Sequence, residues 1–474
     1  MLCILPLARY GLPYFCPFMH YAHLFSPQRT GGGLSEGDQD TARHLYQRDF
    51  DRLIFSSAFR RMQNKTQVFP LPEAAVFVHN RLTHSLEVAS VGRSLGNMVG
   101  NHVAKTAGLA DDDADFYRHQ LGAVISAACL AHDIGNPPFG HSGERAISGF
   151  FEKNPGFLAD ISPSLRQDFT AFEGNANGFR ILTFGFKGRQ QGGLRLTQAT
   201  LAATLKYPCA SQAMLGKKGP LSRKKYGFFD SCRPAFAQVF EKTGMQYHPG
   251  QTGEACLRHP FTFLTEAADD ICYRIIDLED GHRLGIVPFD QIEYMLRGLI
   301  EHMAEPGALS KMDANLTVLK EGGDNNEVVG YYRARVINAL ISATVEVYIK
   351  NEQAILSGSL ESSLLDSIGG HGQKVLDDID TYSVKNLYQH RSVVEIEIAG
   401  YKILGGLLEE FVPALLSAKP TDYERRVKAL IPSQFLPDEG STPYQQVQAA
   451  VDFVSGMTDN FALALYRKLM GIDW

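Results

Sequence analysis

The residue types best suited to chemistry in this chain are two histidines and two aspartates: His84, His132, Asp133 and Asp269. Two neutral imidazoles and two carboxylates suit a hard or borderline divalent cation, and they leave coordination positions open for water and phosphate oxygens. A second histidine and a glutamate, His141 and Glu144, follow the His132-Asp133 pair closely. An open cation site beside such a pair is typical of metal-assisted hydrolysis. These residues therefore predict a phosphohydrolase.

The adjacent His132 and Asp133 are the core of this interpretation. They follow a nearly continuous apolar run, Leu121 to Ala131, and precede the helix-breaking string GNPP. This pattern places the pair at the end of a buried helix, where polar groups need a reason to be present. From these residues alone, metal binding and an ordinary polar helix end are equally open.

His141 and Glu144 lie three residues apart, directly after the breakers. A histidine that a nearby glutamate orients can transfer a proton at neutral pH. The alternative is that Ser142 caps a new helix and that Glu144 is an ordinary first-turn acid. The motif alone leaves both interpretations open.

Asp269, Tyr273 and Asp277 recur at intervals of four residues, so they share one face of a predicted helix. Such a face suits a site that combines a metal ligand with polar contacts to a sugar. For this helix alone, a solvated face bearing a few acids is the simpler explanation. His84, alone on a half-apolar helix, can equally be an ordinary core or surface histidine.

Composition excludes several classes of protein. The chain has 474 residues, which suggests two or three substructures, and its net charge of -6 argues against a protein that coats nucleic acid. Seven cysteines without regular spacing favour reduced thiols in a cytoplasmic protein. No window resembles a membrane span, and the first twenty residues lack a cleavable signal pattern. A glycine-rich phosphate loop and a zinc-protease helix are both absent.

The elements that must position these residues are predicted to be helices. Apolar residues recur three and four apart over 81–104, 114–132, 197–206, 259–282, 289–303, 330–351, 384–417 and 445–470. Alternating strand patterns are scarce, so we expect a mostly α protein. Residues 305–326 and 432–444 are predicted to be polar connections. The part after about residue 350 is expected to form a separate bundle or to extend the same core.

Six strings in order give the chain a family resemblance: FSSAFRRMQNKTQVFPL, NRLTHSLEVA, AHDIGNPPFGHSGE, FEGNANGFRIL, AADDICYRIIDLEDG and VVEIEIAGY. They resemble the bacterial deoxyguanosinetriphosphate triphosphohydrolases of the HD-domain superfamily, from about Leu24 to near the C-terminus. The resemblance implies a helical HD-domain core over 24–300, with a metal site between residues 84 and 277. A helical C-terminal region over 301–474 would pack on that core. Residues 1–23 would be a poorly ordered extension.

The resemblance also implies roles for individual residues. The ligands of Mg²⁺, Mn²⁺ or Co²⁺ would be His84, His132, Asp133 and Asp269, and the catalytic residues would be His141 and Glu144. Tyr273 would pack against the 2′-deoxy edge of the sugar, and Asp277 would accept a hydrogen bond from its 3′-hydroxyl. Four further residues would contact substrate: Arg81, Lys206, Asn175 and Gln67.

The implied activity is hydrolysis of dGTP to deoxyguanosine and inorganic triphosphate, by attack of water at the α-phosphorus. The alternatives are a triphosphohydrolase of all deoxynucleotides, another HD-domain nucleotide phosphohydrolase, or a nucleic-acid-binding regulator with a vestigial site. A cytoplasmic homo-oligomer is implied, with a hexamer as one expected size. The basic segment 217–225 is expected to be a solvated loop; the alternative is an effector site for single-stranded DNA or a nucleotide.

Overall fold

The computed structural model describes residues 18–32, 44–70, 77–248 and 253–472. These residues form twenty α-helices, short 3-10 turns and isolated β-bridges, without a β-sheet among them, which confirms the predicted mostly α fold. The first ten helices are α1 Leu45–Ile54, α2 Ser57–Arg61, α3 Arg81–Thr106, α4 Asp111–His119, α5 Leu121–Ala131, α6 Gly140–Lys153, α7 Pro163–Thr170, α8 Gly174–Thr183, α9 Gln198–Thr204 and α10 Arg233–Lys242. The other ten are α11 Pro260–Arg283, α12 Phe289–Met303, α13 Ala308–Glu321, α14 Asn325–Lys350, α15 Glu352–Leu356, α16 Gly370–Asn386, α17 Arg391–Leu416, α18 Asp422–Ala429, α19 Pro443–Ser455 and α20 Asp459–Leu469.

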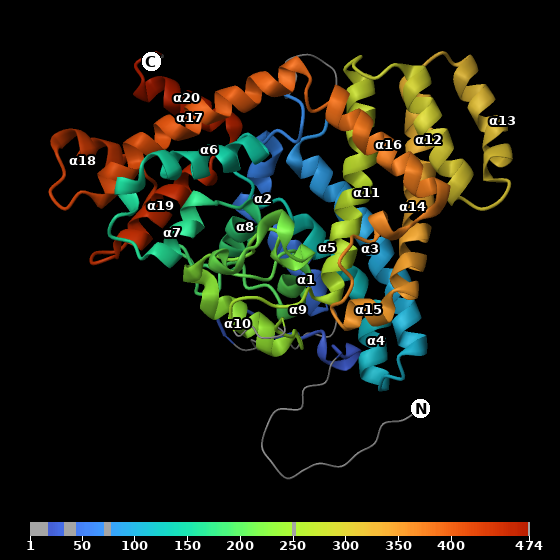
Figure 1. The fold of residues 1–474 in the computed structure, drawn as a ribbon, viewed down its shortest axis with the longest axis horizontal. Helices are drawn as coiled ribbons and strands as arrows, with labels where there is room; N and C mark the ends of the chain where they lie inside the picture. Colours follow the sequence, from blue (N-terminus) through green and yellow to red (C-terminus); the bar gives the residue numbers. More distant parts are fainter. Residues whose placement is uncertain (1–17, 33–43, 71–76, 249–252, 473–474) are drawn as a thin grey trace, which may run out of the picture.

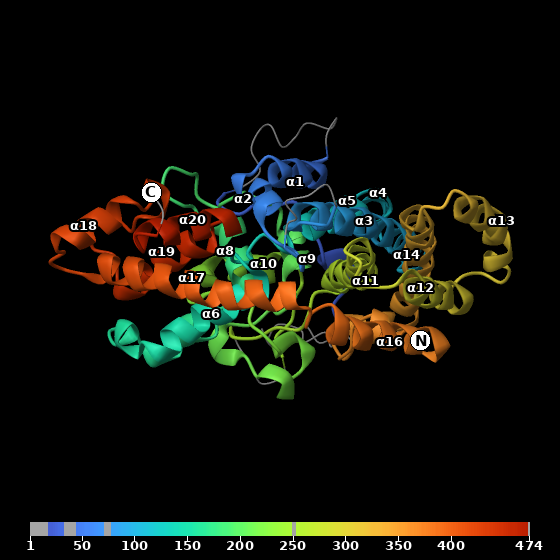
Figure 2. The same ribbon diagram turned by 90° about the horizontal axis from the view of Figure 1, so that it is seen from above.

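Two hydrophobic cores occupy the two halves of the elongated molecule (Figures 1 and 2). The first core is built mainly from α3, α5, α9, α11, α12, α14 and α16. The second is built mainly from α6, α7, α17, α18, α19 and α20. The active-site helices therefore come from both cores, since α3, α5 and α11 belong to the first and α6 belongs to the second.

The expected division at residue 300 does not separate these cores. Helix α14, beyond that boundary, packs on α3 and α11 of the first core. Helix α6, before it, packs on α17 of the second core. Each core contains helices from both sides of residue 300, so no single boundary in the sequence divides one core from the other.

Helix α3 begins at Arg81, where the predicted periodicity over 81–104 also begins. Asn80 forms a capping box: its side-chain oxygen accepts a hydrogen bond from the Thr83 amide at 2.9 Å, and Thr83 Oγ1 accepts one from the Asn80 amide at 3.1 Å. His84 consequently lies at the fourth position of the helix.

Two other expectations differ from the structure. Residues 305–326 contain a helix, α13, whose Met312 and Leu316 are buried four residues apart. The buried side of α13 is a narrow apolar stripe, and most of its other residues are polar. The sequence of this segment therefore has the composition of a polar connection. The packed chain also begins before Leu24, because Met19 and Tyr21 are buried and Tyr21 donates a hydrogen bond to Glu352 at 2.7 Å. The expectation for residues 1–17 lies outside the described residues.

The described cysteines, Cys129, Cys209, Cys232, Cys256 and Cys272, are all buried free thiols.

Among the helices that the structure describes, none combines the length and the apolar character that crossing a membrane requires.

Candidate active site

Three helices bring the four predicted metal ligands together. His84 comes from α3, His132 and Asp133 follow α5, and Asp269 comes from α11. Asp269 Oδ1 lies 3.1 Å from His84 Nε2 and 3.4 Å from His132 Nε2. One ligand atom each of His84, His132 and Asp133 lies within 4.8 Å of the others. The predicted end of the buried helix is confirmed, since α5 ends at Ala131.

The hydrogen bonding of His132 fits a metal ligand. Its Nδ1 donates to the Cys129 carbonyl at 2.6 Å, which leaves the lone pair of the ring on Nε2. His132 Nε2 is buried and has no hydrogen-bond partner among the described residues. A buried polar atom without a partner is costly, and a bound cation would satisfy it. Two imidazoles and two carboxylates are also a donor set suited to a divalent cation.

The charges around the ligands favour a cation as well. Burial alone would raise the pKa of Asp133, but Arg81 and then His132 outweigh it and lower that pKa to about 2. Asp133 also accepts hydrogen bonds from Arg81 and from the Asn136 side chain. Burial opposes protonation of His132, yet the carboxylates of Asp133 and Asp269 raise its pKa to about 9. The cluster thus stabilises positive charge at the position that a cation would occupy.

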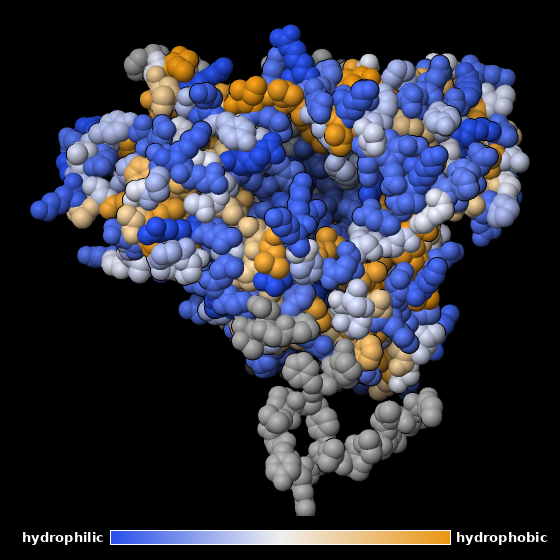
Figure 3. Space-filling model, viewed as in Figure 1, coloured by the Kyte–Doolittle hydropathy of each residue, from blue (hydrophilic) through white to orange (hydrophobic). Residues whose placement is uncertain are grey.

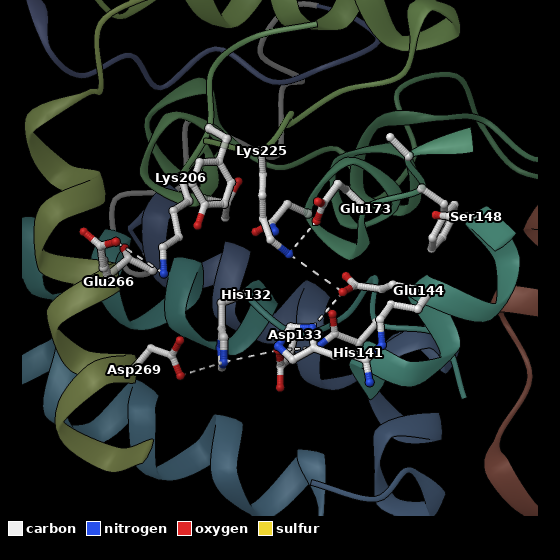
Figure 4. A pocket seen from close by; sticks show the side chains of 18 of the residues that line it. His132, Asp133, His141, Glu144, Ser148, Glu173, Lys206, Lys225, Glu266 and Asp269 are labelled. Carbon is white, nitrogen blue, oxygen red and sulfur yellow. Dashed lines mark hydrogen bonds and ion pairs between the residues drawn. The ribbon is translucent and has the colours of Figure 1, made fainter. Parts of the chain in front are cut away.

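The His141–Glu144 pair lies at the start of α6. His141 Nδ1 is 2.7 Å from Glu144 Oε2, and the Gly174 amide donates to Glu144 Oε1 at 2.7 Å (Figure 4). The imidazole of His141 is 71% exposed, whereas Glu144 is buried. Glu144 therefore fixes the orientation of a ring whose other nitrogen is accessible to a substrate.

Ser142 does not cap this helix, so that interpretation is wrong. Helix α6 begins at Gly140 without a side-chain cap, and Ser142 Oγ donates to the Phe139 carbonyl at 2.7 Å. Phe139 and Gly140 both have left-handed backbones, with φ of 63° and 57°. A Cβ on Gly140 would lie 2.6 Å from the Arg81 guanidinium, so glycine is required for this close approach.

The C-terminal helices hold the turn that joins Asp133 to His141. Lys65 Nζ donates to the Asn136 carbonyl at 2.5 Å and to the Ser455 carbonyl at 3.3 Å. Asp459, the first residue of α20, accepts hydrogen bonds from the Thr66 amide at 2.8 Å and the Phe139 amide at 3.0 Å. The position of His141 thus depends on residues more than three hundred positions later in the chain.

The main cavity, of about 860 Å³, contains the catalytic pair and most of the ligand cluster. It opens near the middle of the face in Figure 3, where hydrophilic residues line a hollow. Lys206 and Asn175 line it, and Lys206 Nζ lies 3.3 Å from Glu266. Lys225 and Glu173 line it too, with Lys225 Nζ 2.7 Å from the Glu173 carboxylate.

A second cavity of about 400 Å³ meets the same cluster from the other side. Gln67, Arg81 and Tyr273 line it, and Asp133 and Asp269 line both cavities. The Tyr273 ring stacks on the ring of Tyr388, with centroids 5.8 Å apart. Tyr388 is a residue that the sequence did not single out.

Asp277 lies behind the second cavity and does not line it. The residue is buried, and its carboxylate accepts a hydrogen bond from the Tyr388 hydroxyl at 2.8 Å. Burial raises the pKa of Asp277 to about 8, even though this hydrogen bond lowers it. The carboxyl group is therefore largely protonated at neutral pH.

Neither expectation for the basic segment 217–225 describes Lys225. Lys217, Lys218 and Lys224 are exposed, as a solvated loop requires, but Lys225 turns into the main cavity. The signal that could have separated it is the apolar string that follows, since Tyr226, Phe228 and Phe229 are all buried. A lysine that borders a buried string must be held against the protein.

Comparison with known proteins agrees with this geometry. The family model described as HD domain matches residues 81–166, and the phosphohydrolase-associated domain matches residues 373–468. A deoxyguanosinetriphosphate triphosphohydrolase-like protein of Synechocystis is 40% identical over 467 residues, which cover 96% of this chain and 100% of the relative. A protein of the same description from Pseudomonas aeruginosa is 36% identical, with 96% and 99% covered. A deoxyguanosinetriphosphate triphosphohydrolase of Salmonella paratyphi A is 29% identical, with 90% and 94% covered. The chain belongs to the deoxyguanosinetriphosphate triphosphohydrolase-like family of HD-domain phosphohydrolases.

Proposed function

We propose that this protein, a nucleotide triphosphohydrolase by family, hydrolyses dGTP to deoxyguanosine and inorganic triphosphate. The observation that carries the proposal is that three of the predicted metal ligands and the catalytic pair line one cavity, the main cavity. His132, Asp133 and Asp269 line it together with the His141–Glu144 pair and three lysines, Lys153, Lys206 and Lys225. A polyphosphate in this cavity would meet positive charge along its length and a proton-transfer group at one end.

His84, His132, Asp133 and Asp269 would hold a divalent cation, for which Mg²⁺, Mn²⁺ and Co²⁺ are the candidates. When bound, such a cation offsets charge on phosphate oxygens and lowers the pKa of a coordinated water. Arg81 orients Asp133 through their ion pair, so it would act on the ligand as well as on substrate.

His141 would supply the proton that the leaving group needs. As the oxygen of water joins the α-phosphorus, the bond to the 5′-oxygen breaks, and that alkoxide requires a proton. Burial would raise the pKa of Glu144, but the hydrogen bond and charge of His141, together with Lys225, lower it below its ordinary value. Glu144 therefore stays a carboxylate and would stabilise the protonated imidazole.

Lys206, Lys225 and Asn175 would bind the phosphate chain in the main cavity, because all three line it. The second cavity would hold the nucleoside, where Tyr273 would pack against the 2′ edge of the sugar and exclude a 2′-hydroxyl. Gln67 would contact the sugar or base, since its side-chain oxygen is buried without a partner among the described residues. The expected hydrogen bond from the 3′-hydroxyl to Asp277 would require Tyr388 to leave this buried carboxylate, which its hydroxyl binds at 2.8 Å.

A homo-oligomer, an effector site for single-stranded DNA or a nucleotide, and a cytoplasmic location stay predictions of the family resemblance. The rival interpretation, a regulator with a vestigial site, would more naturally accompany a lost ligand or a lost catalytic residue. His84, His132, Asp133, Asp269, His141 and Glu144 are all present.

The test is product analysis after separate incubation of the metal-loaded protein with dGTP, dATP, dCTP, dTTP and GTP. We expect deoxyguanosine and inorganic triphosphate from dGTP, with little product from the others. Comparable hydrolysis of all four deoxynucleotides would assign a general deoxynucleotide triphosphohydrolase instead. Monophosphate and pyrophosphate, or no turnover with any of the candidate metals, would overturn the proposal.

A further inference from the structure

A chain of charged side chains crosses the main cavity from His141 to Glu173 (Figure 4). His141 contacts Glu144 at 2.7 Å, Glu144 lies 3.8 Å from Lys225 Nζ, and Lys225 Nζ lies 2.7 Å from Glu173. The Lys225 side chain is 29% exposed and the Glu173 side chain is 13% exposed. The lysine is thus accessible from the cavity but is bound to a carboxylate before any substrate arrives.

The Glu173 carboxylate has no evident structural task. Glu173 directly precedes α8, yet its side chain does not cap that helix. Glu144, by contrast, is already satisfied by His141 and by the Gly174 amide. The ion pair with Lys225 is therefore the main contact that Glu173 makes, and it is the shorter of the two ion pairs of Lys225.

A second lysine of the cavity, Lys206, provides a contrast. Lys206 lies 3.3 Å from Glu266, but Glu266 is also bound by the buried Arg258 at 2.5 Å. If Lys206 moved onto a phosphate, Glu266 would keep Arg258 as its cation. If Lys225 did so, Glu173 would lose its cation beside the carboxylate of Glu144, at a cost in free energy.

We propose that Glu173 is a positioning residue that holds Lys225 in the free site and competes with the phosphate chain for it. This inference rests on the proposed function. Binding of triphosphate must break the Lys225–Glu173 pair, so part of the attraction between lysine and phosphate is cancelled. Inorganic triphosphate is a multiply charged product, and this competition assists its release after each turnover.

The electrostatics of Glu173 support this inference. Burial and then the neighbouring Glu144 raise the pKa of Glu173, while Lys225 lowers it. Its ionised form therefore depends on Lys225. When Lys225 leaves for the phosphate chain, Glu173 must take up a proton or stay unpaired beside Glu144, and either outcome costs free energy that weakens triphosphate binding.

The test measures how tightly inorganic tripolyphosphate binds to the metal-loaded full chain by isothermal titration calorimetry. Glu173→Gln keeps the shape of the side chain and removes its charge. We expect its Kd for tripolyphosphate to fall about threefold to tenfold, in the range of a partly exposed ion pair. Steady-state kinetics with dGTP should show a lower KM together with a lower kcat, because product leaves more slowly.

Two further variants isolate the contact. Glu152→Gln removes a charge from the same cavity at a residue that forms no ion pair with Lys225 among the described contacts, and its Kd should change far less. In a Lys225→Met background, Glu173→Gln should no longer tighten binding. An unchanged or weaker Kd in Glu173→Gln, equal tightening in Glu152→Gln, or tightening that persists without Lys225 would each overturn the inference. Failure of the proposed function is a separate result, namely that the wild type forms no triphosphate from any deoxynucleotide.

Discussion

The two cavities that meet at the ligand cluster differ in the side chains that line them. The main cavity contains paired lysines and carboxylates together with the His141–Glu144 pair. The second cavity is lined by the stacked rings of Tyr273 and Tyr388 together with the charged Arg81, and Asp277 behind the rings is held largely protonated. Asp133, Asp269 and His141 line both cavities. In the proposed reaction, the cluster therefore separates the charged phosphate chain from the neutral nucleoside, with the scissile bond between them.

The largest expected effect comes from breaking the cluster that both cavities share. His132→Ala removes the ligand that lies between Asp133 and Asp269, so metal binding should be lost and dGTP hydrolysis should fall by a factor on the order of 10⁴ or more. Metal content by mass spectrometry and product analysis would measure the two effects. His119→Ala, at an exposed histidine of α4, is the matched control and should keep both. Full metal content in the His132 variant would exclude this residue as a ligand.

The next largest effect should come from His141, which lines both cavities. His141→Ala is expected to lower kcat by about 10²- to 10⁴-fold, because the leaving 5′-oxygen loses its proton donor. KM should change little, since the phosphate-binding lysines and the rings of Tyr273 and Tyr388 are intact. Steady-state kinetics with dGTP would measure both constants. Full activity would remove His141 from the mechanism.

A smaller effect should appear in the second cavity alone. Tyr273→Ala opens space beside the sugar, so the preference for dGTP over GTP should fall by about tenfold or more. The measurement is the ratio of kcat/KM for the two nucleotides. Tyr294→Ala, at a tyrosine that is 77% exposed on α12, should leave this ratio unchanged. If discrimination survives in Tyr273→Ala, the sugar is recognised by other residues.

The smallest effect concerns stability and tests whether Asp277, behind the tyrosine rings of the second cavity, is uncharged. The pKa of Asp277 is about 8 in the folded protein and is raised from its ordinary value by burial. The folded state therefore keeps a proton that the unfolded state has released, and wild-type stability should fall as pH rises toward about 8. Asp277→Asn removes this dependence. The Tm of the variant minus the Tm of the wild type should therefore be about 2–4 °C larger at pH 9 than at pH 5. Parallel Tm curves across this range would show that Asp277 is ionised throughout.

Local sequence patterns predicted the helices, including those that carry the metal ligands. The apolar periodicity over 259–282 corresponds to α11, and the breakers after Ala131 mark the end of α5. Those signals are local, because a helix and its end depend on neighbouring residues. The pairing of α6 with α17 into a second core had no such signal, since it joins segments about 250 residues apart.

The same reason explains the residues of the site that the sequence did not reveal. Tyr388 meets Asp277 across 111 residues, and its own neighbours carry no chemical motif. Lys225 resembled the other basic residues of its loop, because the direction of a side chain depends on the packing of the string beside it. Contacts between distant segments decide both cases, and one sequence does not record them.

The hydrogen bonds that the end of α19 and the start of α20 make to the region before His141 have a consequence for synthesis of the protein. Asp459 binds the Phe139 and Thr66 amides, and Ser455 binds Lys65 through its carbonyl. A nascent chain on the ribosome exposes the metal ligands long before residue 459 has been translated. Its turn between Asp133 and His141 lacks these anchors until translation is nearly complete. A truncated product that ends before α20 would therefore contain every predicted catalytic residue and still lack the arrangement that hydrolysis requires.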